Sequence, residues 1–442
     1  MSTPSTILTF EQARHLVEQH AATLRPRGKE LVELLDSLGQ ILAEPVLADR
    51  NFPPFPRATR DGYAVRAADL AQLPATLAVI AEIKAGGTAD ASLKVESGQA
   101  AAIMTGAPAP PGCDAVVMVE YTSRNGDQVT ITKGIAAGDN IVPTAAEAKR
   151  GDRLLSPGVR LDHAAIAVAG SVGRSRLLVY SKPRVAVLAT GDELVDIDVP
   201  LAPNQIRNSN TYSLAAQVQA AGGEPVLLPI APDEPERLRE LIADGLEADL
   251  LLLSGGVSMG KYDLVEQVLA QFEAEFFFTG AQIQPGRPVV FGRIPCVPGV
   301  PARERGEDRS GGQGFSRADK SIKGALASDV HTYFFGLPGN PVSTMVTFEL
   351  FARPVLEALA GMTPRKLIFL HAKLKSEIKT KPGLKRFLPA ILSGEFEQAE
   401  VELVRWQGSG DIAATASANC YIVIPPDREQ IAAGEWVPLL MR

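Results

Sequence analysis

The sequence is poor in cysteine and has no apolar run long enough to cross a membrane. Its 442 residues include three cysteines, Cys113, Cys296 and Cys420, with no C-x-x-C spacing between them. A scattered, odd-numbered set argues against a disulfide framework and is typical of a reducing compartment. No apolar run approaches the ~20 residues of a transmembrane helix, and no signal peptide is recognisable. We therefore expect a cytoplasmic protein.

Acidic residues outnumber basic residues in this chain, and histidine is scarce. Lys and Arg total 44 against 51 Asp and Glu, a formal net charge of −7. So acidic a chain lacks the electrostatic footprint of a protein that binds nucleic acid or an anionic membrane. The five histidines form no cluster with one another or with cysteine, which argues against a zinc site. Any metal is expected to be a hard cation such as Mg²⁺, held by carboxylates and phosphate.

Apolar residues, in contrast, make up 45% of the chain, and their pattern divides it into regions. Residues 181–364 alternate continuous apolar runs with helical stretches, as in a doubly wound parallel α/β sheet. Short β-type runs fill 51–147 and 365–442, which predicts an inserted β domain and a C-terminal β-barrel. Residues 1–50 and 148–180 are expected to form one helical and β linker region that is discontinuous in sequence.

Local signals add detail within these regions. Thr9 and Gln12 have capping-box spacing and begin a predicted helix. Either Asn208 or Ser209 is the candidate N-cap of a second helix, and Asp233 is the candidate N-cap of a later one. Residues 298–324 are charged and rich in Gly and Ser, so they cannot bury enough apolar surface to order themselves. We expect a flexible insertion there, either a lid or a plain spacer.

Three loops at strand ends of the α/β region have the composition of an anion site. The loops SGGVSMG (254–260) and GLPGNPVS (336–343) combine glycines with hydroxyls, and Asn340 and Pro341 suit a helix start whose N–H groups face an anion. The loop ATGDEL places Glu193 nearby, which predicts a cation between this carboxylate and a phosphate. Each loop alone could also be a plain strand-to-helix turn. Neither glycine loop is a Walker A or G-x-G-x-x-G motif.

Two motifs of the β region are weaker signals. Asp61, in RDGYAV, and Thr105, in MTGAP, could each contact a ligand or only shape a turn.

Taken in order, these motifs resemble the molybdopterin molybdenumtransferase family, which includes bacterial MoeA and the E domain of animal gephyrin. The segments that carry the resemblance span nearly the whole chain: PPFPRATRDGYAVR, IMTGAPAPPGCDAVVMVE, ATGDEL, NQIRNSN, LSGGVSMGKYDLV, QPGRPVVFG, FGLPGNPVST and QGSGDIAATASANCYIVIP. The resemblance implies that adenylylated molybdopterin and molybdate react with the help of Mg²⁺, that AMP is released and that molybdenum is left on the dithiolene. It also implies a homodimer, with the linker region as dimerisation region and each active site between the α/β region of one subunit and the β domain of the other.

Carried over residue by residue, the resemblance implies two sets of site residues. The catalytic carboxylates would be Asp61, Glu193, Asp233 and Asp263, of which Glu193 and Asp263 would bind the metal. The residues that bind the molybdopterin and its phosphates would be Thr105, Ser254, Gly255, Gly256, Ser258, Gly260, Arg287, Gly336, Pro338, Gly339, Asn340, Pro341, Ser343 and Ser409.

The chain departs from the family at a few positions. Arg60 replaces a usual Met, Gln284 and Gly280 stand where the family has lysines, and 298–324 replaces a few residues. A molybdate site short of two cations should bind its anion more weakly, since each charge-assisted hydrogen bond contributes roughly 1.5–3 kcal/mol.

These departures leave alternatives open. The chain could be a non-catalytic carrier or scaffold that binds molybdopterin, or a tungsten-inserting relative. For the enzyme, the implied partners are a molybdopterin adenylyltransferase upstream and molybdoenzyme apoproteins downstream, without nucleic acid or membrane.

Overall fold

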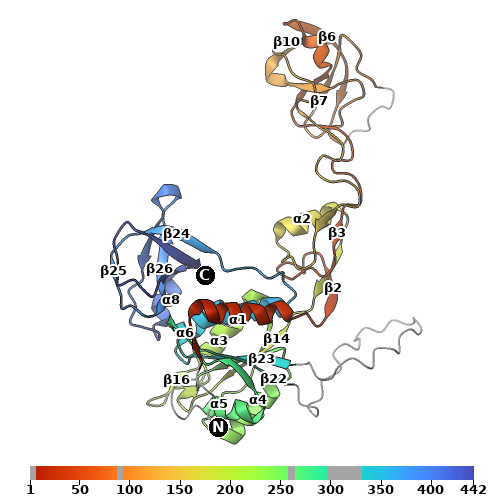
Figure 1. Cartoon of the computed structure of the whole chain (residues 1–442). Helices are drawn as coiled ribbons and strands as arrows, with labels where there is room; N and C mark the ends of the chain where they lie inside the picture. The colour runs from red at the N-terminus through yellow and green to blue at the C-terminus, as the bar shows by residue number, and fades with distance from the viewer. Residues whose placement is uncertain (1–5, 87–92, 257–263, 296–330) are drawn as a thin grey trace, which may run out of the picture. The chain divides into compact units, whose positions relative to one another are not determined.

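The computed structural model describes residues 6–86, 93–256, 264–295 and 331–442, and these divide into two compact units (Figure 1). Unit 1 comprises Met1–Glu30, Gly39–Ala43 and Leu178–Arg442, and unit 2 comprises Leu31–Leu38 and Glu44–Leu177. None of the helices in the described ranges is both long and apolar enough to cross a bilayer. The insertion expected at 298–324 lies outside the described residues. The exact boundaries of the four predicted regions stay a prediction.

A six-stranded sheet forms the centre of unit 1, in the order β17-β14-β18-β23-β22-β19. Its strands are β14 (Arg184–Ala189), β17 (Glu224–Leu227), β18 (Leu250–Ser254), β19 (Glu275–Phe278), β22 (Val290–Pro295) and β23 (His331–Leu337). The first four in the sheet order are parallel, which confirms the predicted α/β fold class. The last two are antiparallel to their neighbours, an edge that many doubly wound sheets carry.

The register of the parallel strands decides where their loops begin. Ala189 lies opposite Ser254, and Ser254 lies opposite Leu337. These are the last residues of β14, β18 and β23. The three strands therefore end level, and the loops after them start at one edge of the sheet.

Helices cover both faces of this sheet. They are α1 (Phe10–Thr23), α3 (Ser209–Ala221), α4 (Pro235–Gly245), α5 (Leu264–Gln271), α6 (Pro341–Thr347), the π-helical segment η3 (Phe348–Ala352) and α7 (Arg353–Leu359). Leu250 and Leu252 of β18 enter the apolar cluster with α1, α3, α6 and α7. Leu251 and Leu253 enter the other cluster, with α4 and α5. This alternation buries the strand on both faces and explains its continuous apolar sequence.

The predicted helix starts are partly confirmed. The Thr9 side chain accepts from Gln12 N, and the Gln12 side chain accepts from Thr9 N, which is the capping box expected at α1. Asn208 caps α3 by accepting from Thr211 N. The expectation for Asp233 is wrong, because the N-cap of α4 is Glu234, which makes no side-chain capping bond. Asp233 instead uses Oδ1 to accept from the Thr190 hydroxyl at 3.1 Å.

The long helix from α6 to α7 is interrupted at η3, and the cause is Pro354. Proline has no N–H, so it cannot donate to the carbonyl of Leu350, four residues earlier. Arg14 of α1, which is only 7% exposed, donates from Nη1 to that carbonyl. Its Nε donates to Glu18 Oε1 at 2.7 Å. A buried guanidinium from α1 therefore satisfies the carbonyl that Pro354 leaves without its helical partner.

The C-terminal part of unit 1 is a closed barrel, as predicted. Its five strands are β24 (Phe369–Leu374), β26 (Lys385–Ser393), β27 (Glu400–Leu403), β28 (Cys420–Ile424) and β30 (Trp436–Met441), and the pairing of β26 with β28 completes the ring. The short helix α8 (Ile412–Ser417) follows β27. Strand β21 (Ile283–Gln284) extends from the α/β region and pairs with Lys385 and Arg386 of β26. The barrel is thereby joined to the α/β region by a backbone pairing.

Short pairings complete unit 1. They are β1 (Ile7–Leu8) with β20 (Gly280–Ala281), β15 (Leu194–Val195) with β16 (Ile206–Arg207), and β25 (Ile378–Lys379) with β29 (Gln430–Ile431). The strands β2 (Lys29–Glu33) and β13 (Arg176–Tyr180) pair where the chain leaves and re-enters the unit.

Unit 2 contains a second six-stranded sheet, in the order β8-β5-β7-β6-β10-β9. Its strands are β5 (Gly62–Val65), β6 (Ala75–Ile83), β7 (Gln99–Ile103), β8 (Ala115–Met118), β9 (Thr122–Asn125) and β10 (Gln128–Ile131). Tyr63 and Val65 belong to one apolar cluster and Ala64 to another, so both faces of β5 are buried.

The rest of unit 2 consists of short elements. They are β3 (Val46–Leu47), which pairs with β12 (Arg153–Leu155), β4 (Arg57–Ala58), which pairs with β11 (Ile141–Val142), and α2 (His163–Ser171), which Asp162 caps by accepting from Ala165 N.

The Arg14 contact predicts a specific loss of stability. In the Arg14→Ala variant the Leu350 carbonyl stays buried without its donor, and we expect a loss of about 1–3 kcal/mol. The two tryptophans of the chain, Trp406 and Trp436, both lie in unit 1, so urea unfolding followed by tryptophan fluorescence reports on this unit. Glu18→Gln is the control, because the substituted amide keeps an oxygen acceptor for Arg14 Nε and leaves the Leu350 contact in place. Equal losses in the two variants would contradict the proposed role of the Leu350 contact.

Candidate functional site

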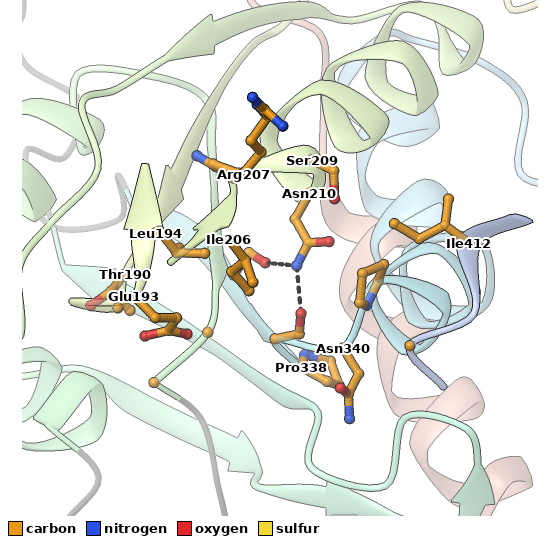
Figure 2. A pocket seen from close by; sticks show the side chains of 18 of the residues that line it. Thr190, Glu193, Leu194, Ile206, Arg207, Ser209, Asn210, Pro338, Asn340 and Ile412 are labelled. Atoms are coloured by element: carbon orange, nitrogen blue, oxygen red, sulfur yellow. Dashed lines mark hydrogen bonds between the residues drawn. The ribbon is translucent and has the colours of Figure 1, made fainter. Parts of the chain in front are cut away.

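A cavity of about 720 Å³ lies where the loops after β14, β18 and β23 meet (Figure 2). Its lining residues come from seven places in the sequence: Thr190, Gly191, Glu193 and Leu194; Ile206 to Asn210; Asp233; Ser254 to Gly256; Pro288; Pro338 to Pro341; Gly410 and Ile412. All of these belong to unit 1. The carboxyl edge of a parallel sheet is the usual ligand site of doubly wound folds.

Glycines bring the loop after β18 unusually close to its neighbours. Gly255 has φ +92°, and a Cβ built on it would lie 2.5 Å from the carbonyl oxygen of Thr190. A Cβ on Gly339 would lie 3.6 Å from the Cα of Gly255, which is ordinary contact. The Gly255 backbone therefore packs between the loops after β14 and β23, and only glycine fits there.

A side chain that the sequence did not single out ties two of these loops together. Asn210, in the first turn of α3, donates from Nδ2 to Ser254 Oγ at 2.9 Å and to the Gly339 carbonyl at 2.7 Å. Ser254 is 2% exposed. Figure 2 shows both hydrogen bonds as dashed lines that start at the Asn210 amide.

Carboxylates line another part of the cavity. Glu193 and Asp233 are both lining residues. Asp233 is held by two hydrogen bonds: its Oδ1 accepts from the Thr190 hydroxyl, and its backbone N donates to Asp192 Oδ1 at 3.0 Å. Arg207 is the one cationic side chain among the described lining residues, and its Nε donates to the Ile197 carbonyl at 2.8 Å. The described wall is therefore net acidic.

No group of three or more His, Cys, Asp and Glu side chains in the described ranges is arranged to hold a metal ion. Asp263, which the family resemblance pairs with Glu193 for this role, lies outside these ranges, as do Ser258 and Gly260.

The start of α6 offers fewer free N–H groups than the sequence suggests. Pro341 has none, and Val342 N donates to the carbonyl of Ser409 at 3.0 Å. Asn340 occupies the N-cap position, as expected, but its side chain makes no capping bond. Instead, the hydroxyl of Thr344 donates to the Asn340 carbonyl at 3.0 Å and to that of Pro338. The barrel loop at Ser409 therefore covers part of the predicted anion site.

Several other predicted site residues lie near the cavity without lining it. Gly336 is buried inside β23, and Ser343 is buried in α6 with 4% exposure. Arg287 is exposed, and its carbonyl accepts from Ala281 N at 3.0 Å, while the next residue, Pro288, is a lining residue. Whether these residues contact a ligand stays a prediction.

The two positions at which the resemblance leads us to expect lysines, 280 and 284, differ in their surroundings. Gly280 is buried, and a Cβ built on it would lie 3.2 Å from Ile7 Cγ1. Gln284 is exposed and lies opposite Arg386 in the β21–β26 pairing. A side chain at position 280 would therefore need the Ile7 side chain to move slightly, whereas the side chain at position 284 is exposed.

Asp61 and Thr105 are brought together in unit 2. Asp61 Oδ1 accepts from Thr105 N at 2.6 Å, and this bond, together with one from the Thr105 side chain, lowers the pKa of the Asp61 carboxyl below its ordinary value of 3.8. Asp61 is an exposed residue. The two motifs RDGYAV and MTGAP, which are separate in sequence, therefore form one exposed acidic site.

Comparison with known proteins gives matches along nearly the whole chain. Three family models match in order: the MoeA N-terminal region (domain I and II) at 8–173, a probable molybdopterin binding domain at 186–358 and the MoeA C-terminal region (domain IV) at 371–441. A molybdopterin molybdenumtransferase of Nostoc sp. is 33% identical over 422 residues, which cover 93% of this chain and 88% of that protein. The chain belongs to the molybdopterin molybdenumtransferase family.

Other members of the molybdopterin molybdenumtransferase family match with similar coverage. The molybdopterin molybdenumtransferase of Haemophilus influenzae is 31% identical over 437 residues, which cover 98% of each chain. The crystal structure of a molybdopterin biosynthesis MoeA protein from Pyrococcus horikoshii aligns with a TM-score of 0.73 and 27% identity, and the alignment covers 99% of this chain and 100% of that one. The family suggested by the sequence motifs is confirmed.

The lining residues that sequence reasoning missed are concentrated in one motif of this family. Arg207, Ser209 and Asn210 all belong to NQIRNSN, which carried part of the resemblance but was given no role in ligand binding. Pro288 and Ile412 were also missed. The available signal was the position of NQIRNSN directly before a helix that packs on the sheet, which places its first turn near the strand ends.

The close packing at Gly255 gives a prediction about stability. Gly255→Ala should destabilise unit 1 by more than about 1 kcal/mol, because alanine disfavours the positive φ and its Cβ would meet the Thr190 carbonyl. Gly339→Ala is the matched control in the facing loop, where the new methyl makes only ordinary contacts. Urea unfolding followed by tryptophan fluorescence compares the two variants. A Gly255→Ala variant as stable as Gly339→Ala would contradict the close packing.

The Asp61–Thr105 hydrogen bond predicts a pH dependence. Because the folded-state pKa of Asp61 is lowered, the bond is fully formed above pH 3.8 and is lost as the pH falls through that lower value. In protein labelled with ¹⁵N-threonine, the amide resonance of Thr105 should titrate with a midpoint below 3.8. Asp61→Asn should abolish this titration. A midpoint at the ordinary value or above it would show that the bond does not favour the carboxylate.

Proposed function

We propose that this protein transfers molybdenum from molybdate to adenylylated molybdopterin in molybdenum cofactor biosynthesis, with release of AMP. The observation that carries the proposal is the cavity at the level ends of β14, β18 and β23, which lies mostly inside the segment matched by the probable molybdopterin binding domain. Full-length similarity to molybdopterin molybdenumtransferases supports the same activity.

Each part of the cavity has a role in this proposal. The backbone of Gly255, Gly256 and Gly339 lets a flat, anionic ligand approach closely, and Ser254 offers a hydroxyl. Glu193 and Asp233 lie on the acidic part of the wall, where they orient the phosphate end of the substrate. Preorganised groups of this kind stabilise charge that develops during group transfer.

We propose Mg²⁺ as the cation of this site. Magnesium sites that also hold substrate phosphates commonly use only one or two carboxylates, with waters in the remaining positions. Glu193 and Asp233 line the cavity, and Asp233 keeps one oxygen, Oδ2, beyond the one that Thr190 uses. The described carboxylates therefore fit the ion, and Glu193 is the proposed direct ligand. The family resemblance implies Asp263 as the second ligand, while Asp233 lines the same cavity. Bound Mg²⁺ would supply positive charge at the leaving phosphate.

We also propose that the active protein is a cytoplasmic homodimer. Unit 2 exposes Leu31, Leu35 and Leu38 by 60%, 79% and 62%. The apolar helix α2 lies beside this segment, since a Cβ built on Gly170 would be 3.8 Å from Leu34 Cδ2. Three large apolar side chains exposed on one short segment support a protein–protein interface there. In the proposed dimer, Asp61 of one subunit acts with Glu193 of the partner subunit on one substrate.

One observation favours a second candidate function, a molybdopterin carrier without transferase activity. Two carboxylates and one guanidinium line the described cavity, and an acidic wall attracts molybdate poorly. Molybdate-dependent release of AMP from adenylylated molybdopterin by the purified protein separates the two functions. Tight molybdopterin binding without AMP release would refute the transferase function and support the carrier function.

The dimer proposal predicts complementation between two inactive variants. Asp61→Ala and Glu193→Gln should each lower AMP release by at least about 100-fold, since both remove a charged group from the reacting centre. When the two variants are dissociated and reassembled together, half of the dimers are mixed and each has one intact site. Activity should then return to about a quarter of the wild-type value. A reassembled mixture no more active than either variant alone would refute the shared site.

A further inference from the structure

Asn210 connects two loops of the cavity through a single side-chain amide (Figure 2). Ser254 is the last residue of β18, and Gly339 follows the end of β23 by two residues. The amide nitrogen of asparagine has two hydrogens, and here one is donated to each loop. Since the Gly339 carbonyl can only accept, the nitrogen and not the oxygen of the amide must face it.

This arrangement leaves the other end of the amide without a partner. Asn210 Oδ1 is buried, and no donor in the described ranges reaches it. A buried acceptor without a hydrogen bond is unfavourable. In this orientation the amide nitrogen of Asn210 donates to both loops, and the amide oxygen makes no hydrogen bond.

The contact also decides the direction of the Ser254 hydroxyl. Its oxygen accepts from Asn210, so its own hydrogen must point elsewhere. Within the described part of the chain, Ser254 donates to no acceptor, although its side chain is almost fully buried and lines the cavity. An oxygen atom of a ligand bound in the cavity could accept the hydrogen bond that the Ser254 hydroxyl has left to donate.

We propose that Asn210 is a positioning residue for the molybdopterin substrate. It holds the loops after β18 and β23 at a fixed spacing and directs the Ser254 hydroxyl hydrogen toward an oxygen acceptor of the bound molybdopterin. The inference deepens the proposed function and rests on it for the identity of the ligand.

The same helix provides a matched control. Gln217, two turns after Asn210 in α3, donates from Nε2 to the Met345 carbonyl at 3.1 Å and to Glu349 Oε1 at 2.8 Å. Its Oε1 is likewise buried without a partner in the described ranges. Gln217 does not line the cavity. Truncation to alanine therefore removes the same pattern of contacts at both positions, and only the Asn210 position belongs to the cavity.

The test measures equilibrium binding of molybdopterin under anaerobic conditions to the full-length protein and its variants, together with their melting temperatures. Asn210→Ala and the isosteric Asn210→Asp should each raise the Kd at least about tenfold, and should raise KM more than they lower kcat. Gln217→Ala should lower the melting temperature to a similar degree and change the Kd by less than about twofold. Ser254→Ala should also weaken binding, and the double variant Asn210→Ala/Ser254→Ala should be no worse than either single one.

Two results would overturn the inference, and they are distinguishable from each other. If wild-type protein binds molybdopterin and Asn210→Ala binds it as well as Gln217→Ala does, Asn210 has only a structural role and the proposed function stands. If the folded wild-type protein does not bind molybdopterin at all, the proposed function itself fails, and the inference fails with it.

Discussion

The candidate site depends on the register of three parallel strands. Because Ala189, Ser254 and Leu337 lie in one row across β14, β18 and β23, three loops from distant parts of the sequence begin at the same level. Glycine at position 255 then lets the middle loop pack against the Thr190 carbonyl. A shift of one residue in either pairing would turn the Ser254 side chain to the opposite face of the sheet. Site geometry is thus set by backbone pairing before any functional side chain contributes.

The sequence predicted what local signals control. The capping box at Thr9 and Gln12 and the cap at Asn208 involve residues three apart, so they are visible in a short window. The continuous apolar runs of β14 and β18 reflect burial on both faces, which is why the α/β fold could be expected. The family resemblance rested on motifs spread along the chain, and three family models confirm it.

What the sequence could not predict arises from contacts between distant segments. Asn210 reaches Ser254 and Gly339, which lie 44 and 129 residues away, and no periodicity reveals such a pair. Asp233 looked like a helix cap but turns to the Thr190 hydroxyl. The segment around the start of α6 had the composition of an anion site, yet one of its N–H groups, that of Val342, donates to the Ser409 carbonyl instead. In each instance the partner comes from another element, so only the folded chain shows it.

The split of unit 1 along the sequence has a consequence for how the protein emerges from the ribosome. Strand β1 pairs with β20, and Phe10 packs on Phe351 and Phe387. A segment that precedes unit 2 in the sequence therefore has its packing partners in segments that follow unit 2. Unit 2 lies almost without interruption between them. Since domains fold as units during synthesis, the β domain can be complete while the α/β core still lacks most of its sheet. Helix α1 is therefore synthesised before unit 2 and docks only after it.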